Sequence, residues 1–278
     1  MVRIADRIAS NRLESNVDII RLMRLRTSWL CAALAACLAA IPLRAAAPLS
    51  VAAASDLQAV MPELASRFEQ ATGIALRVSF GSSGQFASQL QNGAPFDTFL
   101  SADDTLVKQL LDSGVAEAPA VTYASARLAL WTRADSGVDL TPGVSALTAP
   151  GVRRIAIANP AHAPYGRAAV DALRHSAIYG LVEPKLVFGE SVSQAAQFAQ
   201  SANADVAIIA MALTYSPAMR ASGRTVEIPP ATFAPLRQTG AVVARSTRKA
   251  DARRLLDFLT SADASALLQR SGYGAARP

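Results

Sequence analysis

Short apolar runs alternate with amphipathic stretches along most of the chain. The runs are four to six residues long, and the stretches that follow them repeat apolar residues at helical spacing. This alternation predicts βαβ units around a parallel sheet. The first set of strand and helix pairs covers residues 49–53 and 57–71, 75–80 and 84–91, and 98–101 and 104–113.

A second set with the same rhythm covers residues 127–131, 154–158, 166–178, 185–188, 193–202 and 206–209. Residues 123–126 can cross from one set to the other, and residues 235–239 can carry the chain back to a last strand and helix at 241–244 and 250–261. We therefore predict an α/β fold of two lobes, each a mostly parallel sheet flanked by helices, with the ligand in the cleft between the lobes. Lobe 1 comprises residues 46–126 and 236–278, and lobe 2 comprises residues 127–235.

The N-terminal segment has the features of a secretory signal peptide. Three arginines between residues 21 and 26 precede an apolar run at 29–43, and small residues follow at 45–47. The apolar run is too short to cross a membrane comfortably. We expect residues 1–45 to be removed on export, with cleavage near Ala45 or Ala46.

Two alternatives concern this segment. Met23 is a second candidate start, because beginning there leaves a compact signal. The run Leu34-Ala35-Ala36-Cys37 offers a lipoprotein interpretation in which Cys37 is acylated. The apolar stretch continues past Cys37, which suits a signal core better than the start of a flexible tether.

The exported part of the chain differs from the full chain in net charge and in cysteine content. Residues 1–45 hold seven of the 27 basic and three of the 21 acidic residues, so the exported part has a net charge of only about +2. A nucleic-acid partner, which needs a clustered basic face, is not supported. Both cysteines fall in the signal, and the two histidines, His162 and His175, are too few for a histidine-based zinc centre.

Two junctions between a predicted strand and a predicted helix carry candidate chemistry. They are Ala53-Ala54-Ser55-Asp56 and Phe80-Gly81-Ser82-Ser83-Gly84. Each places a hydroxyl and free backbone N–H groups at a helix N-terminus, where an oxyanion binds without lysine or arginine. Serine is also a favoured N-cap residue, and for one junction alone capping is the simpler explanation.

The second set supplies two more helix starts, at residues 163–166 and 189–192. All four junctions follow the carboxyl end of a predicted strand, which is the edge where open parallel sheets bind ligands. Four helix N-termini are therefore expected to converge on one cleft. Ordinary turn chemistry explains each of them when it is taken singly.

Five motifs occur in a familiar order and spacing: Val51-Ala52-Ala53-Ala54-Ser55, Ser79-Phe80-Gly81-Ser82-Ser83, Gly93-Ala94-Pro95-Phe96-Asp97, Leu100-Ser101-Ala102-Asp103, and Asn159-Pro160 followed by Pro164-Tyr165-Gly166. With them the chain resembles the molybdate-binding periplasmic proteins of ABC transporters. The resemblance implies a type II periplasmic-binding-protein fold that closes on molybdate or tungstate in the periplasm and delivers it to a membrane permease. It implies no catalysis, no cofactor and no metal held directly by side chains, and we expect a monomer.

The resemblance also implies the ligand contacts. These are the hydroxyl and backbone N–H groups of Ser55 and Ser83, together with the backbone N–H groups of Tyr165 and Val192. Ser82 is an additional candidate that substitutes for or assists Ser83.

One position departs from the family. Many relatives carry a tyrosine at the end of the last strand of lobe 2, where this chain has Ala210. We hypothesise that the hydroxyl of Tyr165 replaces that donor, with Tyr215 as a second source. Asp97 and Asp103 belong to the motifs as well, and we interpret them as caps or turn residues because a carboxylate repels a dianion.

Neutral donors favour an anion that carries no proton, so phosphate should be rejected, whereas sulfate must be discriminated by its smaller size. Two other functions stay open. One is a sulfate or thiosulfate receptor of the same fold. The other is a secreted α/β hydrolase with Ser55 or Ser83 as nucleophile, although neither serine lies in a Gly-x-Ser-x-Gly motif.

Overall fold

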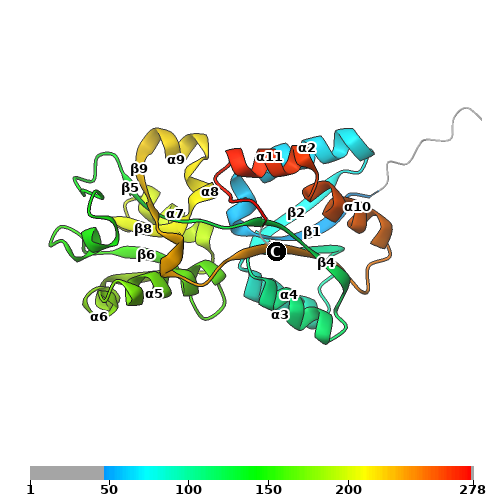
Figure 1. The fold of residues 1–278 in the computed structure, drawn as a ribbon, viewed down its shortest axis with the longest axis horizontal. Helices are drawn as coiled ribbons and strands as arrows, with labels where there is room; N and C mark the ends of the chain where they lie inside the picture. The colour runs from blue at the N-terminus through cyan, green and yellow to red at the C-terminus, as the bar shows by residue number, and fades with distance from the viewer. Residues whose placement is uncertain (1–46, 277–278) are drawn as a thin grey trace, which may run out of the picture. The chain divides into compact units, whose positions relative to one another are not determined.

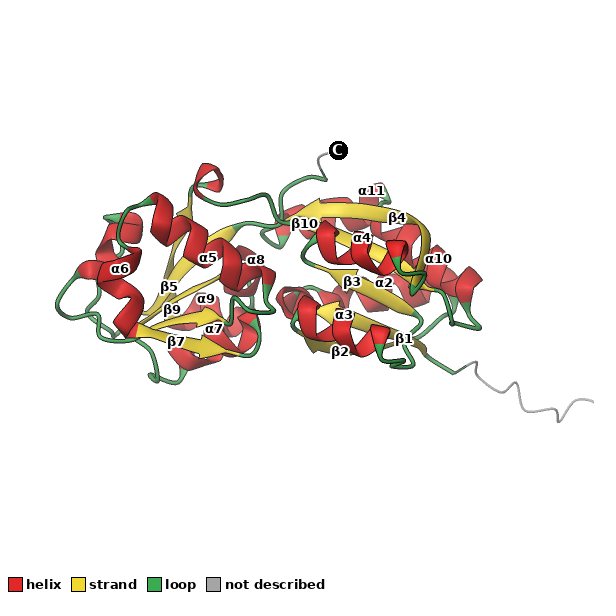
Figure 2. Cartoon of the chain, turned by 90° about the horizontal axis from the view of Figure 1, so that it is seen from below, coloured by secondary structure: helices red, strands yellow, loops and turns green. Residues whose placement is uncertain are grey.

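The computed structural model describes residues 47–276, which form two five-stranded sheets flanked by helices (Figure 1). The predicted signal peptide lies outside the described residues. Figure 2, turned by 90°, shows the sheets as two separate layers with helices on both faces of each. Within residues 47–276 no helix is both long and apolar enough to span a membrane. We call the parts built on the two sheets the first and the second lobe.

The first lobe has the strand order β2-β1-β3-β10-β4. The strands are β1 (Leu49–Ala54), β2 (Leu76–Gly81), β3 (Thr98–Ser101), β4 (Ala116–Ser125) and β10 (Arg237–Val243). β1 pairs in parallel with β2 and β3, whereas β10 runs antiparallel to β3 and β4.

Helices cover both faces of this first sheet, which explains why its interior strand β1 is buried throughout. Ala52 of β1 packs in a cluster with side chains of α3 (Ser83–Gln91) and α4 (Asp104–Asp112). Its neighbours Val51 and Ala53 face the opposite cluster. That cluster includes side chains of α2 (Met61–Thr72), α10 (Lys249–Leu259) and α11 (Ala262–Arg270).

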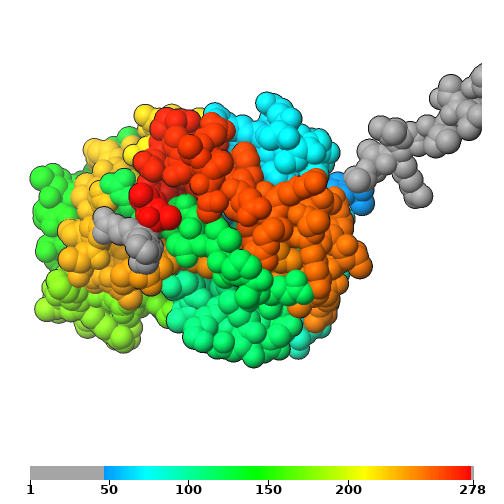
Figure 3. Space-filling model, turned by 45° about the vertical axis from the view of Figure 1, so that its right-hand side comes forward, coloured from blue at the N-terminus to red at the C-terminus, as the bar shows by residue number. Residues whose placement is uncertain are grey.

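The C-terminal helices belong to the first lobe, although the chain has passed through the second lobe before it forms them. In the space-filling view α11 lies beside α2 (Figure 3), and an ion pair of 2.5 Å between Arg67 and Asp263 joins the two helices. An antiparallel bridge between Ser125 and Gly274 also holds the C-terminal segment against the end of β4.

The second lobe repeats the plan with the strand order β7-β6-β8-β5-β9. The strands are β5 (Leu128–Arg133), β6 (Ile155–Ala158), β7 (Leu186–Gly189), β8 (Val206–Ala210) and β9 (Gly223–Ile228). Its helices are α5 (Pro164–His175), α6 (Tyr179–Val182), α7 (Val192–Gln200), α8 (Met211–Thr214) and α9 (Pro217–Ser222), with α5 and α7 on opposite faces of the sheet (Figure 1).

In each sheet one strand, β10 or β5, runs opposite to the other four, so both sheets are mostly parallel as predicted. In the second lobe β6 is parallel to β7 and β8, whereas β5 is antiparallel to β8 and β9. In each lobe the parallel pairs come from the predicted βαβ units, and the antiparallel pairs involve the strands next to a crossing between the lobes. The chain leaves β4 for β5 through residues 126–127 and returns from β9 to β10 through residues 229–236.

Candidate anion-binding site

A small pocket lies where the carboxyl ends of β1 and β2 meet the first turns of α3, α5 and α7. It is lined by Ala54, Ser55, Asp56, Gly81, Ser82, Ser83, Ala102, Ala163, Pro164, Tyr165 and Val192. All five residues that the sequence proposes as ligand contacts line this one pocket, although they come from four segments of the chain. None of the described residues that line it is a lysine, arginine or histidine.

Backbone N–H groups converge on the pocket because of where each residue lies in its helix. Ser55 begins the 3-10 helix η1 (Ser55–Ala59), Ser83 begins α3, Tyr165 is the second residue of α5, and Val192 begins α7. N–H groups in a first turn have no partner within the helix. Among residues 47–276 no backbone acceptor is found for these four groups, so they remain available to an anion.

The hydroxyl oxygens of Ser55 and Ser83 are fixed by hydrogen bonds that they accept. The N–H of Ser193 donates to Ser55 Oγ at 3.3 Å, and the N–H of Ala102 donates to Ser83 Oγ at 3.0 Å. Within the described part of the chain neither hydroxyl has an acceptor for its own proton. Both serines are almost fully buried, so each O–H is held in place with a proton left to donate.

Ser82 differs from these two serines. Its hydroxyl donates to the carbonyl oxygen of His162 at 2.7 Å, and the Nδ1 atom of the same histidine lies 3.1 Å away. The N–H of Gly84 donates to the same carbonyl at 3.0 Å. The proton of Ser82 thus has an acceptor in the second lobe, and the expected contact between this hydroxyl and the anion is replaced by a contact between the lobes.

The hydroxyl of Tyr165 also has a partner other than an anion. It donates to Asp56 Oδ2 at 3.1 Å, and both side chains are buried. The hypothesis that this hydroxyl replaces the donor missing at Ala210 is therefore corrected by the structure. Tyr215 does not line the pocket; its ring lies beside Arg220.

Asp56 is a functional candidate that sequence reasoning passed over. Its side chain is fully buried, and Oδ2 also accepts from Tyr273 Oη at 2.9 Å and from Gln238 Nε2 at 2.9 Å. Tyr123 in turn donates to the amide oxygen of Gln238 at 3.3 Å. The one available signal was a carboxylate placed two residues after the end of a predominantly apolar strand.

The charge of Asp56 has no cationic partner among the described residues. Desolvation raises the pKa of its carboxyl from 3.8 to about 6, and hydrogen bonds from Tyr273, Tyr165 and Gln238 offset part of that rise. The other oxygen, Oδ1, has no hydrogen-bond partner within residues 47–276. A buried carboxylate held by neutral donors therefore borders the pocket.

Residues 49–274 match the family model described as bacterial extracellular solute-binding protein. The chain belongs to this family of solute-binding proteins. The molybdate-binding protein ModA of Azotobacter vinelandii is 36% identical over 230 residues, covering 82% of this chain and 90% of the relative. The molybdate-binding protein ModA of Rhodobacter capsulatus is 33% identical over 230 residues, covering 82% and 89%.

Solved structures agree with this assignment. The periplasmic molybdate-binding protein of Azotobacter vinelandii superposes with a TM-score of 0.77 at 31% identity, covering 82% of this chain and all of that one. The resemblance expected from the sequence motifs and the two-lobed fold of this solute-binding protein are thereby confirmed.

Two aspartates of the motifs have structural roles in this solute-binding protein. Asp97 accepts from the N–H of Ser50 at 2.8 Å and from Ser246 Oγ at 2.6 Å. Asp103 caps α4 by accepting from the N–H of Thr105. Neither carboxylate lines the anion pocket. The interpretation as a cap is confirmed for Asp103, whereas Asp97 supports the fold by joining β1 to Ser246.

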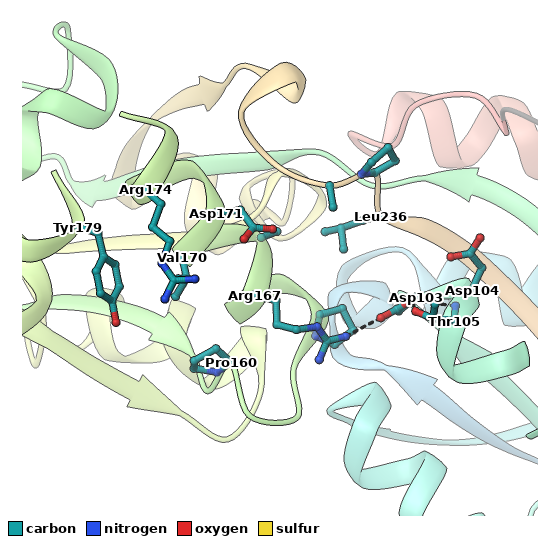
Figure 4. A pocket seen from close by; sticks show the side chains of 14 residues that line it. Asp103, Asp104, Thr105, Pro160, Arg167, Val170, Asp171, Arg174, Tyr179 and Leu236 are labelled. Carbon is teal, nitrogen blue, oxygen red and sulfur yellow. Dashed lines mark hydrogen bonds and ion pairs between the residues drawn. The ribbon is translucent and has the colours of Figure 1, made fainter. Parts of the chain in front are cut away.

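A second cavity of about 560 Å³ lies beside the crossing at residues 234–236 (Figure 4). Arg167 of the second lobe reaches across it to Asp103 of the first lobe, with 2.5 Å between nitrogen and oxygen. Its lining mixes Arg167 and Arg174 with Asp103, Asp104 and Asp171. Because these charges are of both signs, the cavity lacks the uniform donor set of the smaller pocket.

Proposed function

We propose that this solute-binding protein captures molybdate, and also tungstate, in the periplasm for an ABC importer. The observation that carries the proposal is the donor set of the small pocket. Four backbone N–H groups and the hydroxyls of Ser55 and Ser83 surround it without a single cation in its lining. The names of the relatives from Azotobacter and Rhodobacter support molybdate as the ligand.

The donors suit a tetrahedral dianion. Molybdate and tungstate are fully deprotonated at neutral pH, so each oxygen accepts hydrogen bonds and none brings a proton that needs an acceptor. Charge-assisted hydrogen bonds from neutral donors are worth about 1.5–3 kcal/mol each. The dipoles of the helix N-termini also attract the anion, and they do so without a lysine or arginine side chain.

We further propose that the crossings at residues 126–127 and 229–236 act as the hinge between the lobes. The proposed lobe boundaries fall in these segments, because strands on either side of each crossing belong to different sheets. The binding partners are then the anion and the membrane permease, and the protein acts as a monomer. Removal of residues 1–45 on export is part of the same proposal.

A serine hydrolase is not favoured. The hydroxyls of Ser55 and Ser83 accept from backbone N–H groups, and no histidine nitrogen among the described residues is hydrogen-bonded to either oxygen. Ser82 does lie beside His162, but its proton goes to the carbonyl of that residue.

A thermal-shift panel on the mature protein tests the proposal. Molybdate and tungstate at a hundred times Kd should each stabilise the protein by about 2.7 kcal/mol through mass action. Phosphate, sulfate and a generic ester substrate serve as the comparison ligands. Equal stabilisation by sulfate at the same concentration would indicate a sulfate receptor, and turnover of the ester would indicate a hydrolase.

A further inference from the structure

Several hydrogen bonds join the two lobes beside the proposed anion donors, and one of them is donated by the side chain of Tyr165. Tyr165 supplies a backbone N–H to the pocket from the second lobe, and its hydroxyl donates to Asp56 Oδ2 at 3.1 Å. Asp56 follows Ser55, which supplies a hydroxyl and an N–H from the first lobe. The bond therefore links one donor residue, Tyr165, to the residue that follows the other, Ser55, and all three residues line the pocket.

The acceptor end of this bond is anchored to the first lobe. Gln238 of β10 and Tyr273 of the C-terminal segment both donate to the same oxygen of Asp56, each at 2.9 Å. Asp56, Tyr165 and Gln238 are all at least 98% buried, so water does not compete for these bonds. The carboxylate is thus held in place by the first lobe, and in the closed protein it accepts the hydrogen bond from Tyr165 in the first turn of α5.

We propose that the hydrogen bond from Tyr165 to Asp56 sets the width of the anion pocket and thereby its preference for a large tetrahedral oxyanion over sulfate. This inference rests on the proposed function and names how that site selects its ligand. Asp56 and Tyr165 act here as positioning residues, because the carboxylate accepts hydrogen bonds and the phenol gives its proton to that carboxylate.

The physical reason is geometric. A bond of fixed length holds the Tyr165 N–H at one separation from the Ser55 donors. Around an ion with long metal–oxygen bonds that separation completes the hydrogen bonds, whereas around the smaller sulfate ion the donors on one side stay too distant. Ser82 and Gly84 hold the segment before α5 at the carbonyl of His162, so without the bond the first turn of α5 gains freedom at Tyr165 to approach a smaller ion.

Two matched tyrosine variants test the inference. Tyr165→Phe removes the hydroxyl that crosses between the lobes and keeps the ring and the backbone N–H. Tyr273→Phe removes a hydroxyl from the same carboxylate oxygen but lies wholly within the first lobe. Each variant loses one phenolic hydrogen bond to Asp56, so their losses of folding stability should be similar.

The readout is the ratio of the sulfate to the molybdate dissociation constant, measured by calorimetry on the mature protein. We expect Tyr165→Phe to lower this ratio about ten-fold, the equivalent of one hydrogen bond that only the larger ion can use. Tyr273→Phe should leave the ratio at the wild-type value while lowering the melting temperature.

An unchanged ratio in folded Tyr165→Phe, or an equal change in both variants, would overturn the positioning role and leave the proposed function intact. Wild-type protein that does not prefer molybdate to sulfate would instead overturn the proposed function, and this inference with it. The two failures are therefore distinguished by the wild-type measurement.

Discussion

The N–H of Gly84 donates to the carbonyl oxygen of His162 at 3.0 Å, and a Cβ atom at position 84 would lie only 2.3 Å from that oxygen. Gly84 is the second residue of α3 in the first lobe, and His162 precedes α5 in the second. The absence of a side chain at this position is therefore a condition for the lobes to meet as they do.

Gly84→Ala should consequently impair closure more than folding. Its backbone is helical, so alanine favours α3 locally by roughly 0.5–1 kcal/mol, whereas the clash with a backbone oxygen costs the closed form about 1–3 kcal/mol. We expect molybdate affinity to fall about ten-fold or more, with little change in the melting temperature of the ligand-free protein.

Gly180→Ala is the control, because no atom lies within 4 Å of a Cβ there. Equal molybdate affinity in both variants would contradict closure at this contact.

Ser55→Ala and Ser83→Ala should each weaken molybdate binding by roughly 1.5–3 kcal/mol, because each removes a hydroxyl proton that has no acceptor in the described protein. Calorimetric titration measures the loss. Ser66→Ala, at an exposed position of α2, is the matched control and should bind like the wild type. Wild-type affinity in both pocket variants would show that the backbone N–H groups suffice.

The pKa of Asp56 makes a prediction about stability and pH. Its value in the folded protein is about 6 against 3.8 for the ordinary group, so the folded state binds more protons than the unfolded state between these values. The contribution of Asp56 to the free energy of unfolding therefore falls as pH rises from about 4 to about 6, by about 3 kcal/mol in total, and is constant above that range.

Asp56→Asn removes this titration and leaves the other carboxyl groups in place. Denaturant unfolding of the two proteins at several pH values isolates the effect of Asp56. The stability of the variant relative to the wild type should rise between about pH 4 and pH 6. A difference that is constant with pH would mean that burial does not raise this pKa.

Ligand should close the hinge at residues 126–127 and 229–236. Because two chain segments connect the sheets within residues 47–276, the lobes can rotate about them, and opening would separate Ala54 and Ala212 from neighbours in the other lobe. Small-angle X-ray scattering should show a smaller radius of gyration for the mature protein with saturating molybdate. An unchanged radius on saturation would argue against a hinge at these crossings.

The protein recovered from a periplasmic fraction should begin between Ala45 and Pro48, because residues 1–45 have the pattern of a cleaved signal. N-terminal sequencing or intact mass measures the start. A lipidated chain beginning at Cys37 in the membrane fraction would establish the lipoprotein alternative instead.

The sequence was enough to name five of the residues that line the small pocket. Ser55 and Ser83 stand where an apolar run gives way to a helical pattern, and this junction is a local property of the chain. The polarity of parallel strands then predicts that such junctions meet at one edge of a sheet. The same rule predicts that the helix starts at residues 163–166 and 189–192 meet there, whereas Tyr165 and Val192 as individual contacts follow from the resemblance to molybdate-binding proteins.

Only the tertiary structure decided what the remaining polar groups do. The partners of Asp56 are 109, 182 and 217 residues away along the chain, and the acceptor of Ser82 is 80 residues away. A hydroxyl donates one proton, and which acceptor receives it depends on the group that packing brings within about 3 Å. Sequence patterns carry the local conformation of each segment, but the choice between an anion, a carbonyl and a buried carboxylate is made by contacts between segments that meet only in the folded protein.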